Sequence, residues 1–413
     1  MPDTARLEVL LNGTPVASLE RTRRGTLRLS YLADTAYPGS TPLSLSLRPE
    51  EGVFVGARVE NYLWGLLPES DDARRAVQSQ FDADPRDPLS LLGAIGWDCA
   101  GAVQFCHPED REKLRAREGG LEPADDIESR LSAMQFDGSW LLPGEHWSLA
   151  GMQQKFTLTR TTDGWAYPRG STPSTHIVKP GVRSLHHQAL VEHLTMRAAR
   201  TLGVEISNTE YLDFGAERAI VIERFDRTMG AEDTGVRRLH QEDLCQALGN
   251  PQKYEEFGGP GVRDIVRLLR EASASITAAD RSVQAFLDMV VFNTVVKAPD
   301  AHARNFAVLL DGDNIRLAPA YDVATALPYG TQNGRRLGSM SIGGSFDLNE
   351  IGATHWLRLG DEVGVDGEKL ASRAKEIAAA APDAFRDAAE EVNDWDHSVG
   401  AVMERLLPAL NGE

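Results

Sequence analysis

Apolar and polar residues alternate along residues 5–32, which predicts a small antiparallel sheet. The segments ARLEVLL (5–11) and VASLE (16–20) flank the turn Asn-Gly-Thr-Pro, and an Asn-Gly pair between two such runs is a strong hairpin signal. GTLRLSYL (25–32) continues the alternation as a third strand. Over residues 57–106 the apolar residues take up helical spacing instead. The chain is therefore expected to begin with a β-rich module that runs on into helices.

A second β-rich region is predicted beyond residue 127. Its strand candidates are QKFTLTR (154–160), STHIVKP (174–180), EYLDF (210–214) and RAIVIERF (218–225), with one amphipathic helix inserted at about 187–202. The charged stretch 107–126, which contains Gly-Gly and Pro, is the predicted linker before this region.

After Arg227 the pattern is mainly helical. In DRSVQAFLDMVVFNTVVK (280–297) apolar residues occupy nearly every face of a helix, which is typical of a buried one. The predicted fold class is α+β. It comprises an N-terminal module over residues 1–106, a linker over 107–126, a β-rich lobe over 127–226 and an α-helical lobe over 227–413.

Composition and charge narrow the possible functions. With 413 residues, 42% of them hydrophobic and 25% charged, the chain is ordinary globular material, and no run approaches the about 18 apolar residues of a membrane span. The cysteines Cys99, Cys106 and Cys245 form no CxxC pair, which disfavours a structural zinc site and fits a reducing compartment. We therefore expect a soluble, cytoplasmic protein. The net charge of −18 argues against a chain that grips DNA alone, so any role on nucleic acid is expected to depend on a partner.

The stretch KAPDAHARNFAVLL (297–310) carries the candidate chemistry. FAVLL (306–310) and IRLAP (315–319) flank an Asp-Gly-Asp-Asn turn, so the two strands should pair with their outer ends about 5 Å apart. Asn305 precedes the first strand and Tyr321-Asp322 follows the second, which brings an amide and a carboxylate together. Such oxygen ligands suit Mg²⁺, which takes its remaining ligands from water and phosphates.

Asp300 precedes Asn305 by five positions, the D-x-x-x-x-N spacing of protein-kinase catalytic loops. In those loops the Asp accepts the proton of the substrate hydroxyl and the Asn holds a metal ion. The spacing alone also occurs by chance in many proteins. On this segment alone a structural interpretation stays open, in which Asp300 caps a helix and Asn305 caps a turn.

The β-rich lobe adds a lysine to these groups. Lys179 closes the apolar strand STHIVKP, where an ammonium group is costly unless it has an anionic partner or reaches water at the strand end. Glu192 lies in the first half of the following predicted helix. Strand-Lys and helix-Glu pairing is how protein kinases hold a lysine on the α- and β-phosphates of ATP. The segment Glu223–Asp226 ends the last strand before the helical lobe, where a hinge would present backbone groups to adenine.

In this order, these segments resemble the HipA family of bacterial serine/threonine protein kinases, the toxin half of a two-gene toxin–antitoxin module. The resemblance covers essentially the whole chain. It is carried by IGWDCAGAVQF, SLAGMQQKFTL, STHIVKP, ERFDR, HQEDLCQALG, KYE followed by GGPG, DAHARN and PAYD. It implies a bilobal kinase fold, with a β-rich N-lobe and a mainly α-helical C-lobe, that uses ATP and Mg²⁺.

The resemblance also implies roles for individual residues. Asp300 would be the catalytic base, and Asn305 and Asp322 the Mg²⁺ ligands. Lys179, partnered by Glu192, would hold the phosphates. The remaining nucleotide contacts would come from the loop Ala150, Gly151, Met152, Gln153, Gln154 and Lys155, from the hinge Glu223, Arg224, Phe225 and Asp226, with Asp226 on the ribose, and from His302, Ala303, Arg304 and Tyr321.

Two positions depart from the family pattern, and a third residue suggests regulation. Ala301 and Arg304 stand where the family usually has Gly and Lys, and Ala301 requires a negative φ. Ser148 aligns with the serine on which family members phosphorylate themselves, an event thought to eject the phosphate loop; otherwise it is a hydroxyl in a polar loop.

The partners implied are a helix-turn-helix antitoxin of the HipB type, DNA through that antitoxin only, and a protein substrate. The family suggests an aminoacyl-tRNA synthetase, glutamyl-tRNA synthetase first, so that phosphorylation would inhibit translation. Two other functions stay open from the residues: a kinase of small molecules, and a non-catalytic co-repressor docked on a DNA-bound antitoxin.

Overall fold

The computed structural model describes residues 6–411 apart from 36, 38, 138–140, 230–234, 332 and 393–395, and it describes residues 135–137 without their side chains. The chain divides into two compact units. Unit 1 comprises residues 1–180, 213–242 and 309–314, and unit 2 comprises 181–212, 243–308 and 315–413. In the described ranges no helix is long and apolar enough to cross a membrane.

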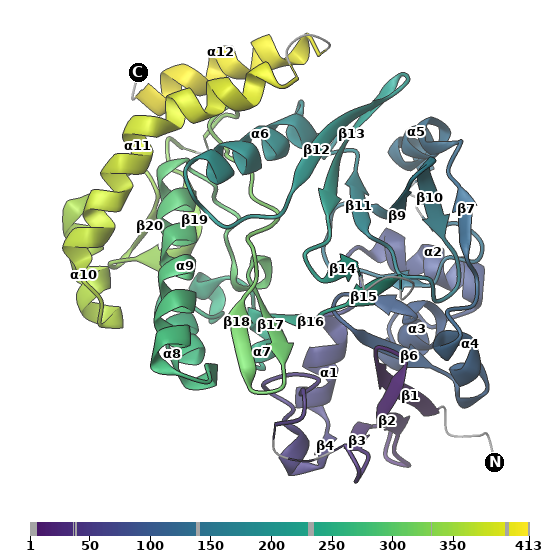
Figure 1. Ribbon diagram of the computed structural model, residues 1–413. Coiled ribbons are helices and arrows are strands. Elements are labelled where there is room, and N and C mark those ends of the chain that lie inside the picture. The colour runs from purple at the N-terminus through teal and green to yellow at the C-terminus, as the bar shows by residue number, and fades with distance from the viewer. Residues whose placement is uncertain are drawn as a thin grey trace. The chain divides into compact units, whose positions relative to one another are not determined.

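Unit 1 begins with the predicted three-stranded meander, extended by one strand on each side (Figure 1). The strand order is β4-β3-β2-β1-β6, with β1 (Arg6–Leu11), β2 (Thr14–Arg21), β3 (Leu27–Tyr31), β4 (Val53–Val55) and β6 (Val103–Cys106). Asn12 and Gly13 both have positive φ, 50° and 78°. This is the turn geometry that suits the twist of a two-residue hairpin, so the prediction from the Asn-Gly pair is confirmed.

The helices predicted over residues 57–106 are present, but the prediction was wrong at their C-terminal end. The helices are α1 (Ala57–Trp64), α2 (Asp71–Phe81) and α3 (Pro88–Ile95). Beyond them the chain forms β5 (Asp98–Cys99) and β6, which pairs with β1 from Glu8↔Cys106 to Leu11↔Val103. All four residues of Val103–Cys106, the polar Gln104 included, are buried in a strand within unit 1, so their burial does not follow a helical periodicity.

A second sheet has the order β12-β13-β11-β9-β10-β7. Its strands are β7 (Leu121–Pro123), β9 (Phe156–Thr161), β10 (Gly164–Pro168), β11 (His176–Lys179), β12 (Thr209–Phe214) and β13 (Glu217–Glu223). Four of these match the predicted strands. The predicted linker also carries structure, namely η2 (Pro108–Asp110), α4 (Arg111–Arg115) and the edge strand β7, which pairs with β10.

Unit 1 also contains several smaller elements. They are η1 (Pro49–Glu51), α5 (Ile127–Asp137), β8 (Trp147–Ser148), β14 (Arg227–Met229), β15 (Val236–Arg238) and most of β16 (His240–Asp243). Strand β8 pairs in parallel with β5, and β14 pairs antiparallel with β15.

Unit 2 is mainly helical, as the sequence predicts (Figure 1). Its helices are α6 (Gln188–Thr201), α7 (Leu244–Ala247), α8 (Val262–Ala272), α9 (Ile276–Val295), α10 (Ala353–Val363), α11 (Gly367–Glu390) and α12 (Ser398–Asn411), with the short turns η3 (Glu255–Phe257) and η4 (Ala303–Asn305). Helix α9 packs against α8 and α11 and buries Phe286, Val290, Phe292 and their neighbours, so the expectation of a buried helix is confirmed.

The predicted hairpin after Asn305 is present as β17 (Ala307–Asp311) and β18 (Asn314–Leu317), in the sheet order β16-β17-β18. A separate pair, β19 (Leu337–Ile342) and β20 (Ser345–Asp347), lies further along unit 2.

Candidate active site

The loop after α9 presents Asp300 to solvent. The helix ends at Val295, and Lys297 then takes a left-handed backbone conformation, with φ 56°, that turns the chain. The Asp300 side chain is 67% exposed, yet it is held in place because the hydroxyl of Tyr254 donates to Oδ1 over 3.0 Å. In the described part of the chain nothing bonds the second oxygen, Oδ2. An oriented carboxylate with one available oxygen is what a proton acceptor requires.

Asn305 is bound to the same loop from the other end. Its side-chain Nδ2 donates 2.7 Å to the backbone carbonyl of Asp300, which leaves the amide oxygen for another ligand. The structural interpretation of this segment is half right: Asn305 does close the turn, but His302 and not Asp300 stands at the N-cap position of η4. Ala301 is absent from the residues with positive φ, so the loop forms without a glycine at that position.

The side chain of His302, in the same loop, is buried. It is 4% exposed, and its Nε2 is 3.7 Å from Oδ1 of Asp300. Burial lowers the pKa of His302, and the carboxylate of Asp300 opposes that shift. The Tyr254 and His302 rings meet edge to face with centroids 5.1 Å apart, so the two side chains support each other.

The hairpin brings Asp322 to this loop as predicted. The Ala318 N–H donates 2.9 Å to the Ala307 carbonyl at the outer end of the two strands, and the Tyr321 hydroxyl donates 2.8 Å to the carbonyl of Arg304. Asp322 is close enough to raise the pKa of His302, against the lowering by burial. It has φ 58°, an uncommon conformation for a residue with a side chain, and such strain is often found at functional sites.

The oxygen donors Asn305 and Asp322 fit a hard cation such as Mg²⁺, because the Asn305 amide nitrogen is already used by the loop and its oxygen is not. Among the described residues no group of three or more His, Cys, Asp or Glu side chains is placed to hold a metal ion.

Arg304 contacts the start of α7. Its Nε is 3.7 Å from Oδ2 of Asp243, while Oδ1 of Asp243 accepts 2.8 Å from the Gln246 N–H in a capping box. The HQEDLCQALG segment therefore supplies a carboxylate that caps α7 and lies near the guanidinium of Arg304.

In unit 1 hydrogen bonds from neighbouring residues hold the predicted phosphate loop. The Lys155 ammonium donates 2.6 Å to the Ala150 carbonyl, and the Glu69 N–H donates 3.1 Å to that of Gly151. Gly151 has φ 107°, a backbone conformation that residues with a side chain rarely adopt, so glycine is favoured there. Met152 is 62% exposed, and Gln153 and Gln154 are half-buried.

Lys179 is 3% exposed and pairs with Ile220 across β11 and β13. Glu192 is fully buried on α6, where Gln188 donates 3.1 Å to it. Lys179 belongs to unit 1 and Glu192 to unit 2, so their pairing stays a prediction.

The predicted hinge segment carries a buried ion network that the sequence did not predict. Asp226 accepts from Arg224 Nε over 3.0 Å and from the Gly101 N–H over 2.6 Å, while the Arg224 side chain also reaches the Ser174 hydroxyl over 2.8 Å. Glu223 is exposed and Phe225 half-buried. The role of Asp226 on the ribose therefore stays a prediction for a carboxylate that already has protein partners.

Asp98 of the N-terminal module is the centre of this network. It lies within 3.3 Å of Arg224, 2.9 Å of Arg227 and 2.9 Å of Arg238. Burial alone would raise the pKa of Asp98, but the three guanidinium groups hold it well below its usual range. Removing one partner of such a buried network typically costs about 3–5 kcal/mol. Asp98 therefore ties the N-terminal module to Arg224 and Arg227 at the predicted hinge.

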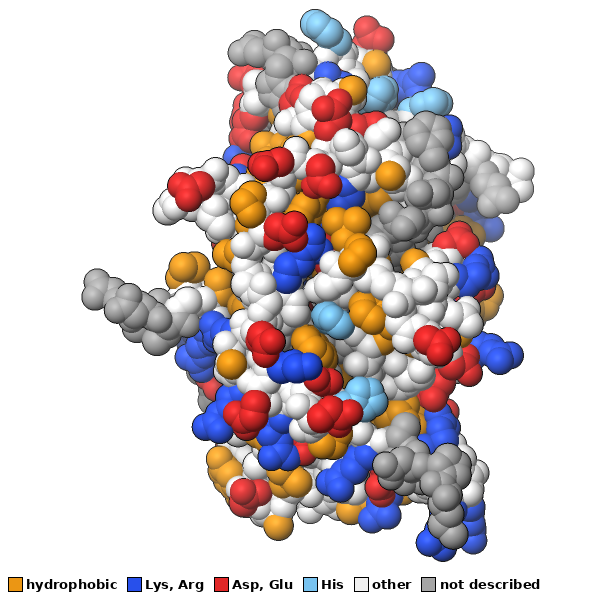
Figure 2. All heavy atoms as spheres, turned by 90° about the vertical axis from the view of Figure 1, so that its right-hand side faces the viewer, with side chains coloured by type: hydrophobic (Ala, Val, Ile, Leu, Met, Phe, Trp, Pro, Cys, Tyr) orange, Lys and Arg blue, Asp and Glu red, His pale blue; other side chains and the backbone are white. Residues whose placement is uncertain are grey.

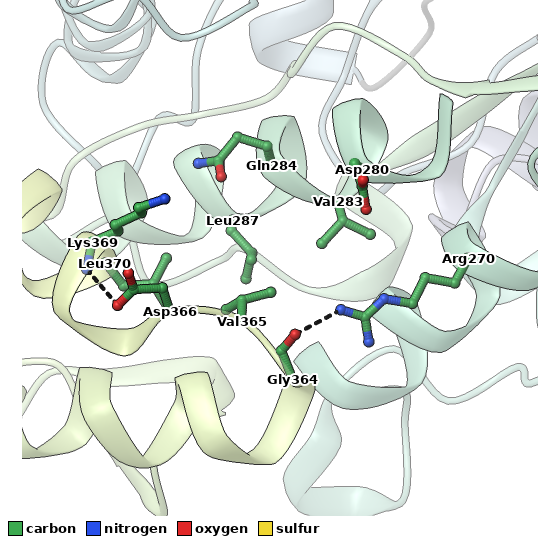
Figure 3. A pocket seen from close by; sticks show the side chains of 10 residues that line it. All are labelled: Arg270, Asp280, Val283, Gln284, Leu287, Gly364, Val365, Asp366, Lys369 and Leu370. Carbon is green, nitrogen blue, oxygen red and sulfur yellow. Dashed lines mark hydrogen bonds between the residues drawn. The ribbon is translucent and has the colours of Figure 1, made fainter. Parts of the chain in front are cut away.

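A hollow of about 240 Å³ lies elsewhere in unit 2, between α8, α9 and the connection from α10 to α11 (Figure 3). Arg270 borders it and donates to the carbonyls of Val363 and Gly364, and Asp366 caps α11 at its edge. None of its lining residues belongs to the predicted site.

Sequence reasoning gave no role to Tyr254 or to Asp98. The signals were present, because KYE and IGWDCAG were among the segments that carry the family resemblance. Both residues act on groups distant in sequence, and a single sequence gives no indication of such pairs.

Comparisons with known proteins cover nearly the whole chain. Residues 7–106 match the HipA N-terminal domain, and residues 147–385 match the HipA-like C-terminal domain. A Sinorhizobium fredii protein named "Putative kinase Y4mE" is 32% identical over 402 residues, which cover 94% of this chain and 93% of that protein. The serine/threonine-protein kinase toxin HipA of Shewanella oneidensis is 29% identical over 382 residues, covering 88% of this chain and 84% of that protein.

The fold also matches a solved structure. HipA of Shewanella oneidensis MR-1, in a complex with HipB and operator DNA, superposes with a TM-score of 0.81 at 26% identity over 98% of this chain and 97% of that one. The predicted fold class, α+β with a β-rich lobe and a mainly helical lobe, is thereby confirmed.

Proposed function

The chain belongs to the HipA family, and from this premise we propose that it is a kinase toxin that transfers the γ-phosphate of ATP to a serine or threonine hydroxyl of a protein. The observation that carries the proposal is the state of Asp300. Its carboxylate is exposed, is oriented by Tyr254 and sits in a loop closed by Asn305.

In this mechanism Asp300 accepts the proton of the attacking hydroxyl through Oδ2. Tyr254 keeps the other oxygen occupied, so the carboxylate does not rotate away. Because burial lowers its pKa, His302 is uncharged near neutral pH. It therefore forms no ion pair with the Asp300 carboxylate.

Asn305 and Asp322 would hold Mg²⁺. The ion neutralises charge on the β- and γ-phosphates when it is bound. Lys179 would hold the α- and β-phosphates, and the loop from Ala150 to Lys155 would cover them. The backbone of Glu223 and Phe225 would bind adenine.

We further propose a HipB-type antitoxin as partner, with DNA bound through it. The relative of known structure was solved together with HipB and its operator DNA. The charge of −18 supports an indirect contact, and the face drawn in Figure 2 has acidic side chains interspersed with the basic ones. The substrate class proposed is an aminoacyl-tRNA synthetase, glutamyl-tRNA synthetase first, with inactivation by phosphorylation of Ser148.

The test incubates the purified 413-residue chain with γ-labelled ATP and a cell extract. Phosphate transfer to proteins and to small molecules of the extract is measured in parallel. Label on protein hydroxyls that disappears with Asp300→Asn supports the proposal. Label on metabolites alone would assign a small-molecule kinase. If neither is labelled while the chain still strengthens operator binding by an antitoxin, it is a non-catalytic co-repressor.

A further inference from the structure

An exposed aromatic side chain stands beside the catalytic loop. Phe257, at the end of η3, is 69% exposed, although burying a ring of this size is strongly favourable. Exposed apolar side chains scattered over a surface are ordinary. Phe257 differs from them in the rigidity of its loop and in what that loop contacts.

Hydrogen bonds fix the backbone around Phe257. The N–H groups of Phe257 and Gly259 donate 3.1 and 2.9 Å to the Tyr254 carbonyl, and the Gly258 N–H donates 2.9 Å to that of Glu255. The Asn250 side chain donates 2.9 Å to the Gly258 carbonyl. At Gly259 a Cβ would lie 2.7 Å from the Tyr254 carbonyl oxygen, so this close turn requires glycine.

Glu255 anchors the same loop to β19. Its carboxylate accepts 2.6 Å from the Ser341 N–H, and burial raises its pKa. The half-buried carboxylate of Glu255 and the hydrogen bonds of the turns therefore hold the segment from Asn250 to Gly261 in place. A loop so constrained loses little conformational entropy when a ligand binds to it.

A continuous series of contacts joins Phe257 to the catalytic loop. The Phe257 and Tyr254 rings meet edge to face with centroids 6.5 Å apart, and the Tyr254 hydroxyl donates to Asp300. A substrate hydroxyl that reaches Asp300 thus places its neighbouring residues within reach of both rings.

We propose that Phe257 and Tyr254 form a docking platform for an apolar or aromatic side chain next to the hydroxyl that is phosphorylated; the inference rests on the proposed kinase activity. Phe257 acts on substrate affinity, because it contacts the neighbour of the acceptor. Tyr254 acts on turnover, because it positions Asp300.

The chain itself contains an acceptor segment of this composition. Ser148 is flanked by Trp147 and Leu149 in EHWSLAGMQQK (145–155). A second copy of this segment, released from its strand, would present a large aromatic side chain directly before the hydroxyl. We therefore use it as the probe.

The experiment measures binding of the fluorescein-labelled peptide EHWSLAGMQQK to the full chain with a non-hydrolysable ATP analogue and Mg²⁺, and phosphate transfer from ATP to the same peptide. The comparison peptide carries Trp147→Ala. Because central aromatic anchors dominate binding, Phe257→Ala should weaken peptide binding about tenfold and raise the peptide KM alike, with the KM for ATP unchanged. It should also remove the preference for the tryptophan peptide.

The matched control is Ile276→Ala. Ile276 is 82% exposed and also in unit 2, but it begins α9, whose 20 residues separate it from the catalytic loop by about 30 Å. This variant should bind and turn over the peptide as the unchanged chain does. Tyr254→Phe should lower kcat at least tenfold at an unchanged peptide KM, since it keeps the ring and removes the donor to Asp300.

Equal peptide affinity in Phe257→Ala and the unchanged chain, equal affinity for both peptides, or no peptide binding would each overturn the platform. Phe257-dependent binding without any phosphate transfer would support the platform and refute the kinase activity. Transfer to both peptides at the same rate, with or without Phe257, would support the kinase activity and overturn the platform.

Discussion

The hydroxyl of Ser148 donates a hydrogen bond of 2.7 Å to the carbonyl oxygen of Leu66, and both residues are buried. Ser148 lies on β8, opposite Cys99 of β5. A kinase cannot reach a hydroxyl in this position, so phosphorylation of Ser148 requires β8 to leave its place. A phosphoserine could not return to the same site, because it would bury nearly two negative charges. Release of the adjoining phosphate loop would follow from this steric and electrostatic conflict.

We expect Ser148→Ala to prevent self-inactivation during long incubation with Mg-ATP, with little change in initial ATP affinity. The lost hydrogen bond leaves the Leu66 carbonyl unpaired and should reduce the free energy of unfolding by about 1–3 kcal/mol. Ser148→Asp carries a single charge and should inhibit only in part. Mass spectrometry of the incubated chain is the measurement. Slowing without phosphate on Ser148, or phosphate there at full activity, would locate the switch elsewhere.

We expect Asp300→Asn to reduce phosphate transfer by orders of magnitude and to leave Mg-ATP binding intact, because a proton acceptor is removed and no metal ligand is lost. The Tyr254 hydroxyl can still donate to the amide oxygen, so the loop should keep its shape. Rates are measured with labelled ATP and binding by calorimetry. More than a tenth of the original rate would remove Asp300 from this role.

Asp322→Asn is expected to weaken Mg-ATP binding about tenfold or more, because it removes the charged oxygen of a site with few protein ligands. Asn is preferred over Ala here, since Asp322 has positive φ, which Asn tolerates and Ala does not. The control is Asp311→Asn at the far end of the same hairpin. Nucleotide calorimetry with and without Mg²⁺ measures the effect, and unchanged affinity would contradict the metal site.

We expect the chain alone to bind duplex DNA negligibly at physiological salt, because its charge is −18. Operator binding should appear only when a small basic helix-turn-helix antitoxin supplies the phosphate contacts. Mobility shifts over a salt series measure this. A tight, sequence-specific complex of this chain by itself would be incompatible with the proposed partnership.

Stability should fall as the pH drops from about 6.5 to about 4. His240 donates through Nε2 to the Leu43 carbonyl at 3.0 Å and accepts through Nδ1 from the Ala102 N–H, so it must be neutral in the fold. Burial lowers its pKa to about 4, although Asp226 opposes the shift. Above pH 6.5 both states are neutral and nothing is lost. Below it only the unfolded state gains a proton, which removes up to roughly 3 kcal/mol.

Urea unfolding between pH 7.5 and 4.5 measures that loss. His240→Gln should flatten the pH dependence, because an amide can donate and accept at the same two positions without charging. The matched control, His186→Gln, changes an exposed histidine and should leave the slope as it was. An equal slope in both variants would show that other groups set the acid sensitivity.

Local order in this protein was predictable from the sequence. Alternation predicted β1, β2 and β3, apolar periodicity predicted α9, and the turn residues predicted the hairpin that joins Asn305 to Asp322, because each depends on residues near one another in the chain. The segment that carries the candidate chemistry was found for the same reason. The prediction failed at Val103–Cys106, a strand whose partner β1 lies almost a hundred residues earlier.

The tertiary structure alone decided which partners the charged and aromatic side chains have. The sequence places Asp98 far from Arg224, Arg227 and Arg238, and Tyr254 far from Asp300. Hydrogen bonds and ion pairs act over a few ångströms of space, and a single sequence records only distance along the chain. The sequence therefore determined which groups could do chemistry, while folding determined which of them hold one another in place.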